Sequence, residues 1–135
     1  MNAPSRDIAS IIEAYGESSG FGLNYAEEIF IGHEPSSPIN AVTIYDTPGF
    51  PPALGLTDQG YEYPSVMIRV RNKSYQTGMS LAQDIVNALH GNSNITVDGA
   101  LYTVIYSTGS PALLDWDDNG NPIIVVNFNL QRRAV

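Results

Sequence analysis

A chain of 135 residues has the size of one domain and is long enough to bury a hydrophobic core. Its 43% apolar and 15% charged residues exclude a disordered chain, and no apolar run is long enough to span a bilayer. The net charge of −8 disfavours a free-standing nucleic-acid binder, and the absence of cysteine removes disulfides, thiolate metal sites and cysteine nucleophiles.

The first third of the chain predicts one helix and two short strands. A Ser5 N-cap precedes an apolar stripe with helical spacing, and this helix should end in the region 16–22. The stripe consists of Ile8, Ile11, Ile12 and Tyr15. Segments 26–34 and 40–46 are rich in β-branched and aromatic residues, which is typical of strands.

The segment 47–63 is unusual because it combines many prolines and glycines with apolar side chains. The prolines and glycines disfavour a regular helix or a central strand. Its large apolar residues are Phe50, Leu54, Leu56, Tyr61 and Tyr63. We interpret the segment as an extended arm that docks on a neighbouring surface. The alternative is a loop that folds back over its own core.

The stretch after the arm predicts a strand at 65–73 with two different faces. Alternation places Val66, Ile68 and Val70 on one face. The other face receives Met67, Arg69, Arg71 and Lys73. Three of the six cations therefore share one face, which we expect to contact another subunit or a partner. The alternative is ordinary solvated surface charge.

The second half of the chain predicts a helix, a hairpin and a last strand. The helix covers about 75–90, with Gly91 as its left-handed cap, and its N-cap is Ser74, Thr77 or Ser80. Its buried stripe consists of Leu81, Ala82, Ile85, Val86 and Leu89. An Asp-Gly turn at 98–99 predicts a hairpin between 95–97 and 100–106.

Residues 109–121 are expected to be a polar connection, followed by a final strand at 122–131. Its apolar face carries Ile124, Val126, Phe128 and Leu130. This order of elements predicts a single α+β domain over 1–135. We expect a mainly antiparallel sheet of about five to six strands with both amphipathic helices packed on it, an α/β sandwich.

The sequence offers little catalytic chemistry. His33 and His90 lack metal-ligand spacing, and no nucleophile elbow, phosphate loop or dinucleotide fingerprint is present. Residues 115–120 match the start of a calcium-binding EF-hand loop, but Val126 replaces its bidentate glutamate. The same residues are typical of a turn before a strand. We therefore expect no enzyme, no cofactor and no metal site.

The acidic segment also contains the single tryptophan. Trp116 should be partly buried or lie at an interface, next to the carboxylates of Asp117 and Asp118. Acidic groups gather here and in the N-terminal third, whereas cations gather at 69–73 and at Arg132 and Arg133. Two oppositely charged surfaces on one small domain suit head-to-tail self-association.

The whole layout resembles the tail terminator, or tail completion, proteins of tailed bacteriophages and the related minor capsid and neck proteins. The resemblance rests on the strand at 42–46 with its Pro/Gly arm, the run 63–71, and the helix 81–89 with Gly91. It also includes Gly99 with Tyr102, and the turn 118–122 before the closing strand. These are patterns of strand, arm and helix, not catalytic signatures.

The resemblance implies a structural virion protein without a cofactor, assembled in the host cytoplasm. It implies a homohexameric ring that caps the tail tube, stops tube assembly and joins the tail to the head–neck connector. Its partners would be further copies of itself, the tail tube protein, the connector and possibly the sheath, with DNA only passing through the lumen and no membrane contact. The implied contact residues are Arg69, Arg71, Lys73, Phe50, Leu54, Leu56, Tyr61, Trp116, Asp117 and Asp118.

Two alternatives remain at this point. One is a head-closure or neck connector protein of the same virion. The other belongs to a different class, a small calcium- or ligand-binding β-rich module.

Overall fold

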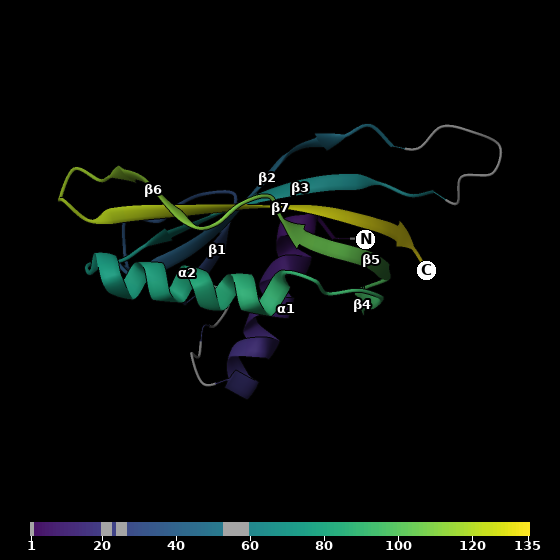
Figure 1. The fold of residues 1–135 in the computed structure, drawn as a ribbon, viewed down its shortest axis with the longest axis horizontal. Coiled ribbons are helices and arrows are strands. Elements are labelled where there is room, and N and C mark those ends of the chain that lie inside the picture. Colours follow the sequence, from purple (N-terminus) through teal and green to yellow (C-terminus); the bar gives the residue numbers. More distant parts are fainter. Residues whose placement is uncertain (1, 20–22, 24–26, 53–59) are drawn as a thin grey trace.

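The computed structural model describes residues 2–19, 23, 27–52 and 60–135, which form two helices and a curled mixed sheet (Figure 1). The helices are α1 (Pro4–Ser19) and α2 (Tyr75–Leu89). The strands are β1 (Ile29–Ile31), β2 (Ala41–Phe50), β3 (Tyr63–Arg71), β4 (Ile95–Val97), β5 (Ala100–Ser107), β6 (Ala112–Trp116) and β7 (Pro122–Ala134).

The sheet has the order β1-β2-β3-β7-β5-β4, and β6 pairs with β7 outside this path. Only β1 runs parallel to its neighbour, and the other pairings are antiparallel. The predicted α+β fold is therefore confirmed. Among the described residues, no helix combines the length and the apolar character needed to cross a membrane.

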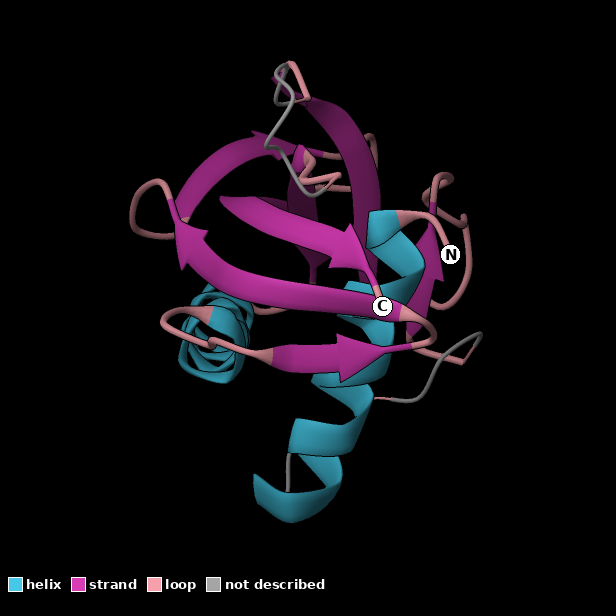
Figure 2. Ribbon diagram, turned by 90° about the vertical axis from the view of Figure 1, so that its right-hand side faces the viewer, coloured by secondary structure: helices cyan, strands magenta, loops and turns pink. Residues whose placement is uncertain are grey.

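The hydrophobic core lies between the helices and the concave face of the sheet, which curves around them (Figure 2). The alternating residues predicted for β3 and β7 are buried, including Val66, Ile68, Phe128 and Leu130. Gly78 allows α2 to pack closely on β7, because a Cβ there would lie 2.8 Å from Ile124 Cδ1. The sequence analysis did not identify this close approach.

Helix α1 begins at Pro4, so the prediction that Ser5 is its N-cap is wrong. Ser5 lies in the first turn, and the Ala3 carbonyl accepts a hydrogen bond from the Arg6 amide at 3.0 Å. Proline is well suited to the first helical position, since the missing amide hydrogen would have no partner there. The helix buries Ile8 and Ile12 as predicted.

Strand β2 extends beyond its predicted end at residue 46 and continues through Phe50. The predicted arm at 47–63 is therefore shorter at both ends, because Phe50 pairs with Tyr63 at the start of β3. A register shift between Thr47 and Phe50 accommodates the proline and glycine between them. Gly49 is required here, since a Cβ would lie 2.0 Å from the Tyr63 carbonyl oxygen. The other early strand is shorter than predicted, since β1 covers only residues 29–31.

The predictions for α2 and for the β4–β5 hairpin are confirmed. Ser74 is the N-cap of α2, and its hydroxyl accepts a hydrogen bond from the Thr77 amide at 3.3 Å. Gly91 follows the helix with a φ of 85°. Asp98 and Gly99 both have positive φ, as a tight hairpin turn requires.

The connection at 109–121 is not simply a polar loop, because it contains strand β6. This strand pairs with the first residues of β7, so the sequence analysis missed a second hairpin. All five residues of β6 are exposed. Because neither face of the strand is buried, its sequence lacks the alternation that reveals a half-buried strand.

Candidate interface surfaces

The guanidinium of Arg71 is used inside its own chain. Its side chain is buried and donates hydrogen bonds to the carbonyl oxygens of Pro35, Pro38 and Ile39, the last at 2.8 Å. The segment that precedes β2 thus crosses the sheet face on which Arg71 lies. Arg71 holds this segment in place, so we do not retain it among the proposed contact residues.

Arg69 and Lys73 differ in how much charge they present to solvent. Arg69 lies 3.4 Å from Glu34 in a partly buried ion pair, with its guanidinium carbon 6.0 Å from the centre of the Tyr45 ring. Lys73 lies beyond the end of β3 and is exposed, and its backbone amide donates to Asn40 Oδ1. Of the three predicted cations, Lys73 has the most accessible charge.

The two C-terminal arginines have different environments because they alternate along β7, which leaves Arg132 buried and Arg133 half-buried. Arg132 is buried and lies 3.6 Å from Asp7 and 3.1 Å from Glu62. It also donates to the Asn2 carbonyl oxygen at 2.9 Å, which ties the N-terminal segment to the last strand. Arg133 bonds through Nη1 to the Ala134 carbonyl oxygen and has no carboxylate partner among the described residues.

Tyr102 completes the buried network around Arg132. Its hydroxyl donates to Asp7 Oδ2 at 2.5 Å and accepts from Arg132 Nη1 at 3.3 Å. Two effects raise the pKa of Tyr102 above its usual value. Burial is the larger effect, and the hydrogen bond to Asp7 is the second. Burial alone would lower the pKa of Arg132, but its bonds to Tyr102 and Glu62 outweigh that effect and raise it. The network stabilises charge within the fold.

The β2–β3 hairpin forms one end of the molecule and projects away from the helices (Figure 1). Phe50 is 64% exposed at this end, although it is a large apolar side chain. Tyr61 is half-buried beyond it. Leu54 and Leu56, which we predicted to act with them, lie outside the described residues. The choice between an arm and a folded-back loop therefore remains a prediction for the tip itself.

The β6–β7 hairpin forms the opposite end (Figure 1). Leu113, Leu114 and Trp116 are 39%, 49% and 52% exposed. One five-residue strand thus supplies three of the eight large hydrophobic side chains that the described residues expose. Isolated exposed hydrophobics are common, but such a cluster on a single strand is typical of a contact surface. Trp116 is exposed and so available to an interface.

The acidic motif at 115–120 covers the end of β6 and most of the turn of this hairpin. Asp117 Oδ1 accepts the amides of Asn119 and Asn121 at 2.9 and 2.8 Å, and its Oδ2 accepts the Asn121 side-chain amide. These hydrogen bonds lower the pKa of Asp117, and the bond from the Asn121 side chain contributes most. The described residues contain no group of three or more His, Cys, Asp or Glu that could hold a metal. The geometry matches the turn interpretation, and Asp118 remains exposed.

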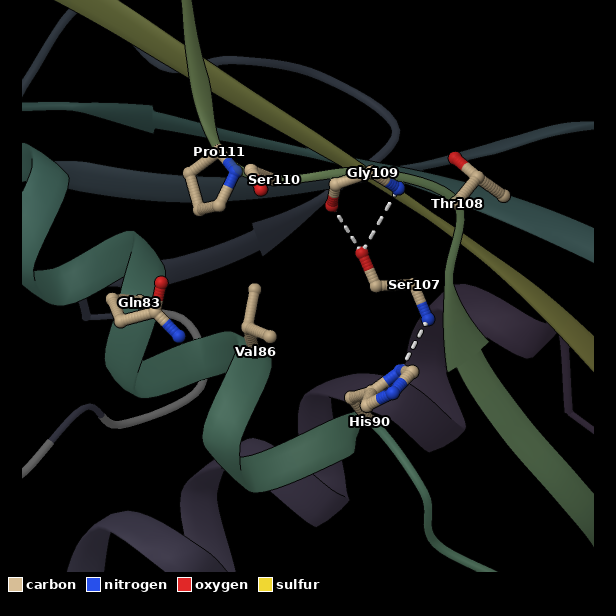
Figure 3. Close-up of a pocket in the computed structure, with 8 residues that line it drawn as sticks. All are labelled: Gln83, Val86, His90, Ser107, Thr108, Gly109, Ser110 and Pro111. Carbon is tan, nitrogen blue, oxygen red and sulfur yellow. Dashed lines mark hydrogen bonds between the residues drawn. The ribbon is translucent and has the colours of Figure 1, made fainter.

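A shallow cavity of about 320 Å³ lies between α2 and residues 107–111 (Figure 3). It brings His90 close to Ser107, which invites comparison with a serine–histidine pair. However, His90 Nδ1 accepts the Ser107 backbone amide at 2.9 Å, while the Ser107 hydroxyl bonds to Gly109. The histidine therefore does not activate this hydroxyl, and the cavity lacks the geometry of nucleophilic catalysis.

A helix-covered, mainly antiparallel sheet with exposed apolar side chains at both ends defines an α+β domain suited to assembly. A chain in a solved structure titled "Virion of native gene transfer agent (GTA) particle" has the same fold, with a TM-score of 0.66 and 12% identity. The similarity covers 98% of this chain and 96% of that chain. No protein with a curated description matches the sequence.

The family described as "Bacteriophage tail terminator protein" matches residues 13–133. The chain therefore belongs to the bacteriophage tail terminator family, and it is a structural protein of the phage tail. This membership confirms the resemblance noted in the sequence.

Proposed function

We propose that this protein caps the end of the phage tail tube as a homo-oligomeric ring, expected to be a hexamer. In this position it terminates tube assembly and joins the tail to the head–neck connector. The observation that carries the proposal is the family match, which covers residues 13–133 and thus almost the whole chain. The protein assembles in the host cytoplasm and contacts the tube protein, the connector and, in a contractile tail, the sheath.

The surfaces of the molecule support an assembly role. Four of the eight large hydrophobic side chains that the described residues expose lie on two hairpins: Phe50 on β2–β3, and Leu113, Leu114 and Trp116 on β6–β7. A ring needs two different contact surfaces on each subunit, because a head-to-tail contact joins unlike faces. Lys73, Arg69 and Asp118 add charge that an adjacent subunit or the tube can pair with.

The net charge of −8 fits a conduit for DNA. An acidic surface repels the phosphate backbone, so the genome can pass through the lumen without binding to it. DNA is therefore a passing cargo in this proposal, and no membrane, cofactor or substrate is involved.

Tube termination can be tested by polymerising the tail tube protein of the same phage with and without this chain. Negative-stain electron microscopy would then give the tube lengths and the density at the tube ends. We expect shorter tubes that carry an extra ring at one end. Unchanged lengths without end density would contradict the proposal. A ring that binds only the connector would favour the neck or head-closure position.

A deletion tests the role of the hairpin. Removing residues 50–60 should leave a folded monomer that no longer assembles, since the described core residues all lie in other segments. Circular dichroism would verify the fold, and size exclusion would report assembly. Assembly that persists after the deletion would show that the hairpin is not needed.

A further inference from the structure

The segment that follows α2 runs beside β5, beyond the part of this strand that β4 covers. The Gly91 amide donates to the Ile105 carbonyl oxygen at 2.8 Å, and the Ile105 amide donates to the Asn92 carbonyl oxygen at 3.0 Å. Alternate amides of a strand point to the same side, so the Ser107 amide faces this segment too. Its acceptor is Nδ1 of His90, at 2.9 Å (Figure 3). An imidazole nitrogen is therefore the last acceptor along this edge of β5.

Only one form of the His90 ring can accept this hydrogen bond. A neutral imidazole carries its proton on one nitrogen and accepts through the other, whereas the charged ring donates from both nitrogens. Nδ1 is the acceptor here, so the neutral ring carries its proton on Nε2. A second proton, taken from the solvent, goes to Nδ1 and sets its N–H against the N–H of Ser107. Protonation of the ring thus removes the contact.

The surroundings of His90 allow its ring to change charge. The side chain is exposed, and the other residues that line the cavity in Figure 3 are uncharged. Asp84, the charged residue of α2, lines a different cavity. Helix α1 also packs against α2, but its Arg6, Asp7 and Glu13 do not line the cavity beside His90. The ring lies at the C-terminal end of α2, where a positive charge interacts favourably with the helix dipole.

The connection between β5 and β6 is held from two sides. On the side of β7, the Thr108 amide donates to the Asn127 carbonyl oxygen at 3.0 Å, and this acceptor does not titrate. On the side of α2, the Ser107 amide is held by His90. Loss of the second bond therefore frees the connection from α2 and leaves its attachment to β7 in place.

We propose that His90 is a pH-dependent acceptor that attaches the last residue of β5 to the end of α2. The neutral ring holds the Ser107 amide, and the protonated ring releases it. Histidine is the side chain whose charge changes between about pH 5 and pH 8, so mildly acidic solution breaks the contact. The effect is local, because His90 is not part of the hydrophobic core. Acid loosens the connection that leads into β6, while the domain stays folded.

Hydrogen exchange of single backbone amides tests the contact in the full chain, whether it is a monomer or a ring. Mass spectrometry with fragmentation would compare the Ser107 and Thr108 amides at about pH 7.5 and about pH 5, corrected for the intrinsic exchange rates. We expect the protection of Ser107 to fall by roughly 3- to 10-fold in acid, the usual contribution of one hydrogen bond. The protection of Thr108 should not change, because its acceptor is a carbonyl oxygen. Equal behaviour of the two amides would overturn the proposal.

Two substitutions separate His90 from other titrating groups. His90→Leu removes the acceptor, so the Ser107 amide should exchange rapidly at both pH values. His90→Asn offers an amide oxygen that does not titrate, so its Ser107 protection should be the same at both pH values. The side chain is exposed, so both variants should fold, which circular dichroism would verify. An acid-dependent loss of protection that persists in His90→Leu would show that another group is responsible.

The position of the ring proton gives an independent measurement. The sequence has two histidines, so His33→Gln leaves His90 as the single imidazole. Nitrogen NMR of the isotope-labelled ring distinguishes an N–H from an unprotonated nitrogen. We expect a proton on Nε2 and an unprotonated Nδ1 in the neutral ring. A neutral ring with its proton on Nδ1 could not accept the Ser107 amide, and it would overturn the proposal.

Discussion

The carboxylate of Asp46 in β2 caps the first turn of α1 through Ser5. Asp46 Oδ1 accepts the Ser5 amide at 2.9 Å, and Oδ2 accepts the Ser5 hydroxyl at 2.7 Å. A carboxylate at a helix N-terminus satisfies a free amide and interacts favourably with the helix dipole. The helix start is therefore fixed by a residue from the sheet, and not by a neighbour in sequence.

Removing this cap should destabilise the protein. Asp46→Ala is expected to lower the free energy of unfolding by about 1–2 kcal/mol, the usual cost of a lost N-cap. Urea unfolding followed by circular dichroism would measure the change. Asp118→Ala removes an exposed carboxylate without this role and should change stability by less than about 0.5 kcal/mol. Equal effects of the two substitutions would show that the cap contributes little.

The neighbouring arginines of β7 should respond differently to the same substitution. Arg132→Met leaves the fully buried Asp7 without its cation, so we expect a loss of about 3–5 kcal/mol. Arg133→Met should leave the free energy of unfolding nearly unchanged, because Arg133 has no ion pair with a described carboxylate. Denaturant unfolding of the two variants measures both effects. A large stability loss for Arg133→Met would contradict the assignment.

Alkaline pH should destabilise the protein partly through Tyr102. Its pKa in the folded protein is raised above the ordinary value of 10.0, so the unfolded chain releases this proton first. The stabilisation is thus complete below about pH 10 and decreases as pH rises above that value. Tyr102→Phe should show a smaller decrease in the free energy of unfolding between pH 9 and pH 11. An unchanged pH dependence would rule out this origin.

Calcium should not stabilise the protein. Both carboxylate oxygens of Asp117 already accept hydrogen bonds within the turn, and they would have to exchange these for metal bonds. We expect the same melting temperature in calcium and in a chelator, measured by scanning calorimetry. A calcium-dependent increase that Asp117→Asn abolishes would instead favour the binding module considered from the sequence.

Local signals in the sequence were sufficient for the elements that carry the core. Helical spacing identified α1 and α2, alternation identified β7, and the Asp98–Gly99 turn identified the β4–β5 hairpin. In each case the pattern arises from burial on one face or from a turn that requires positive φ. These features do not depend on knowing which other segments lie nearby.

The surfaces could not be predicted in the same way. Alternation placed Arg71 on the face away from the core but could not indicate that the segment before β2 covers it. The partners of Arg132 come from distant parts of the chain, and β6 has no buried face to produce a periodic pattern. Whether a cation is available to a partner depends on tertiary contacts that no local pattern encodes.

The mass of the purified protein in solution tests the central claim most directly. Light scattering after size exclusion, at low and at high salt, would measure it over a range of protein concentrations. We expect a ring of about six subunits that dissociates in part at high salt, because screening weakens the charge pairs at the contacts. A strict monomer under all conditions would contradict a ring built from the surfaces of this chain.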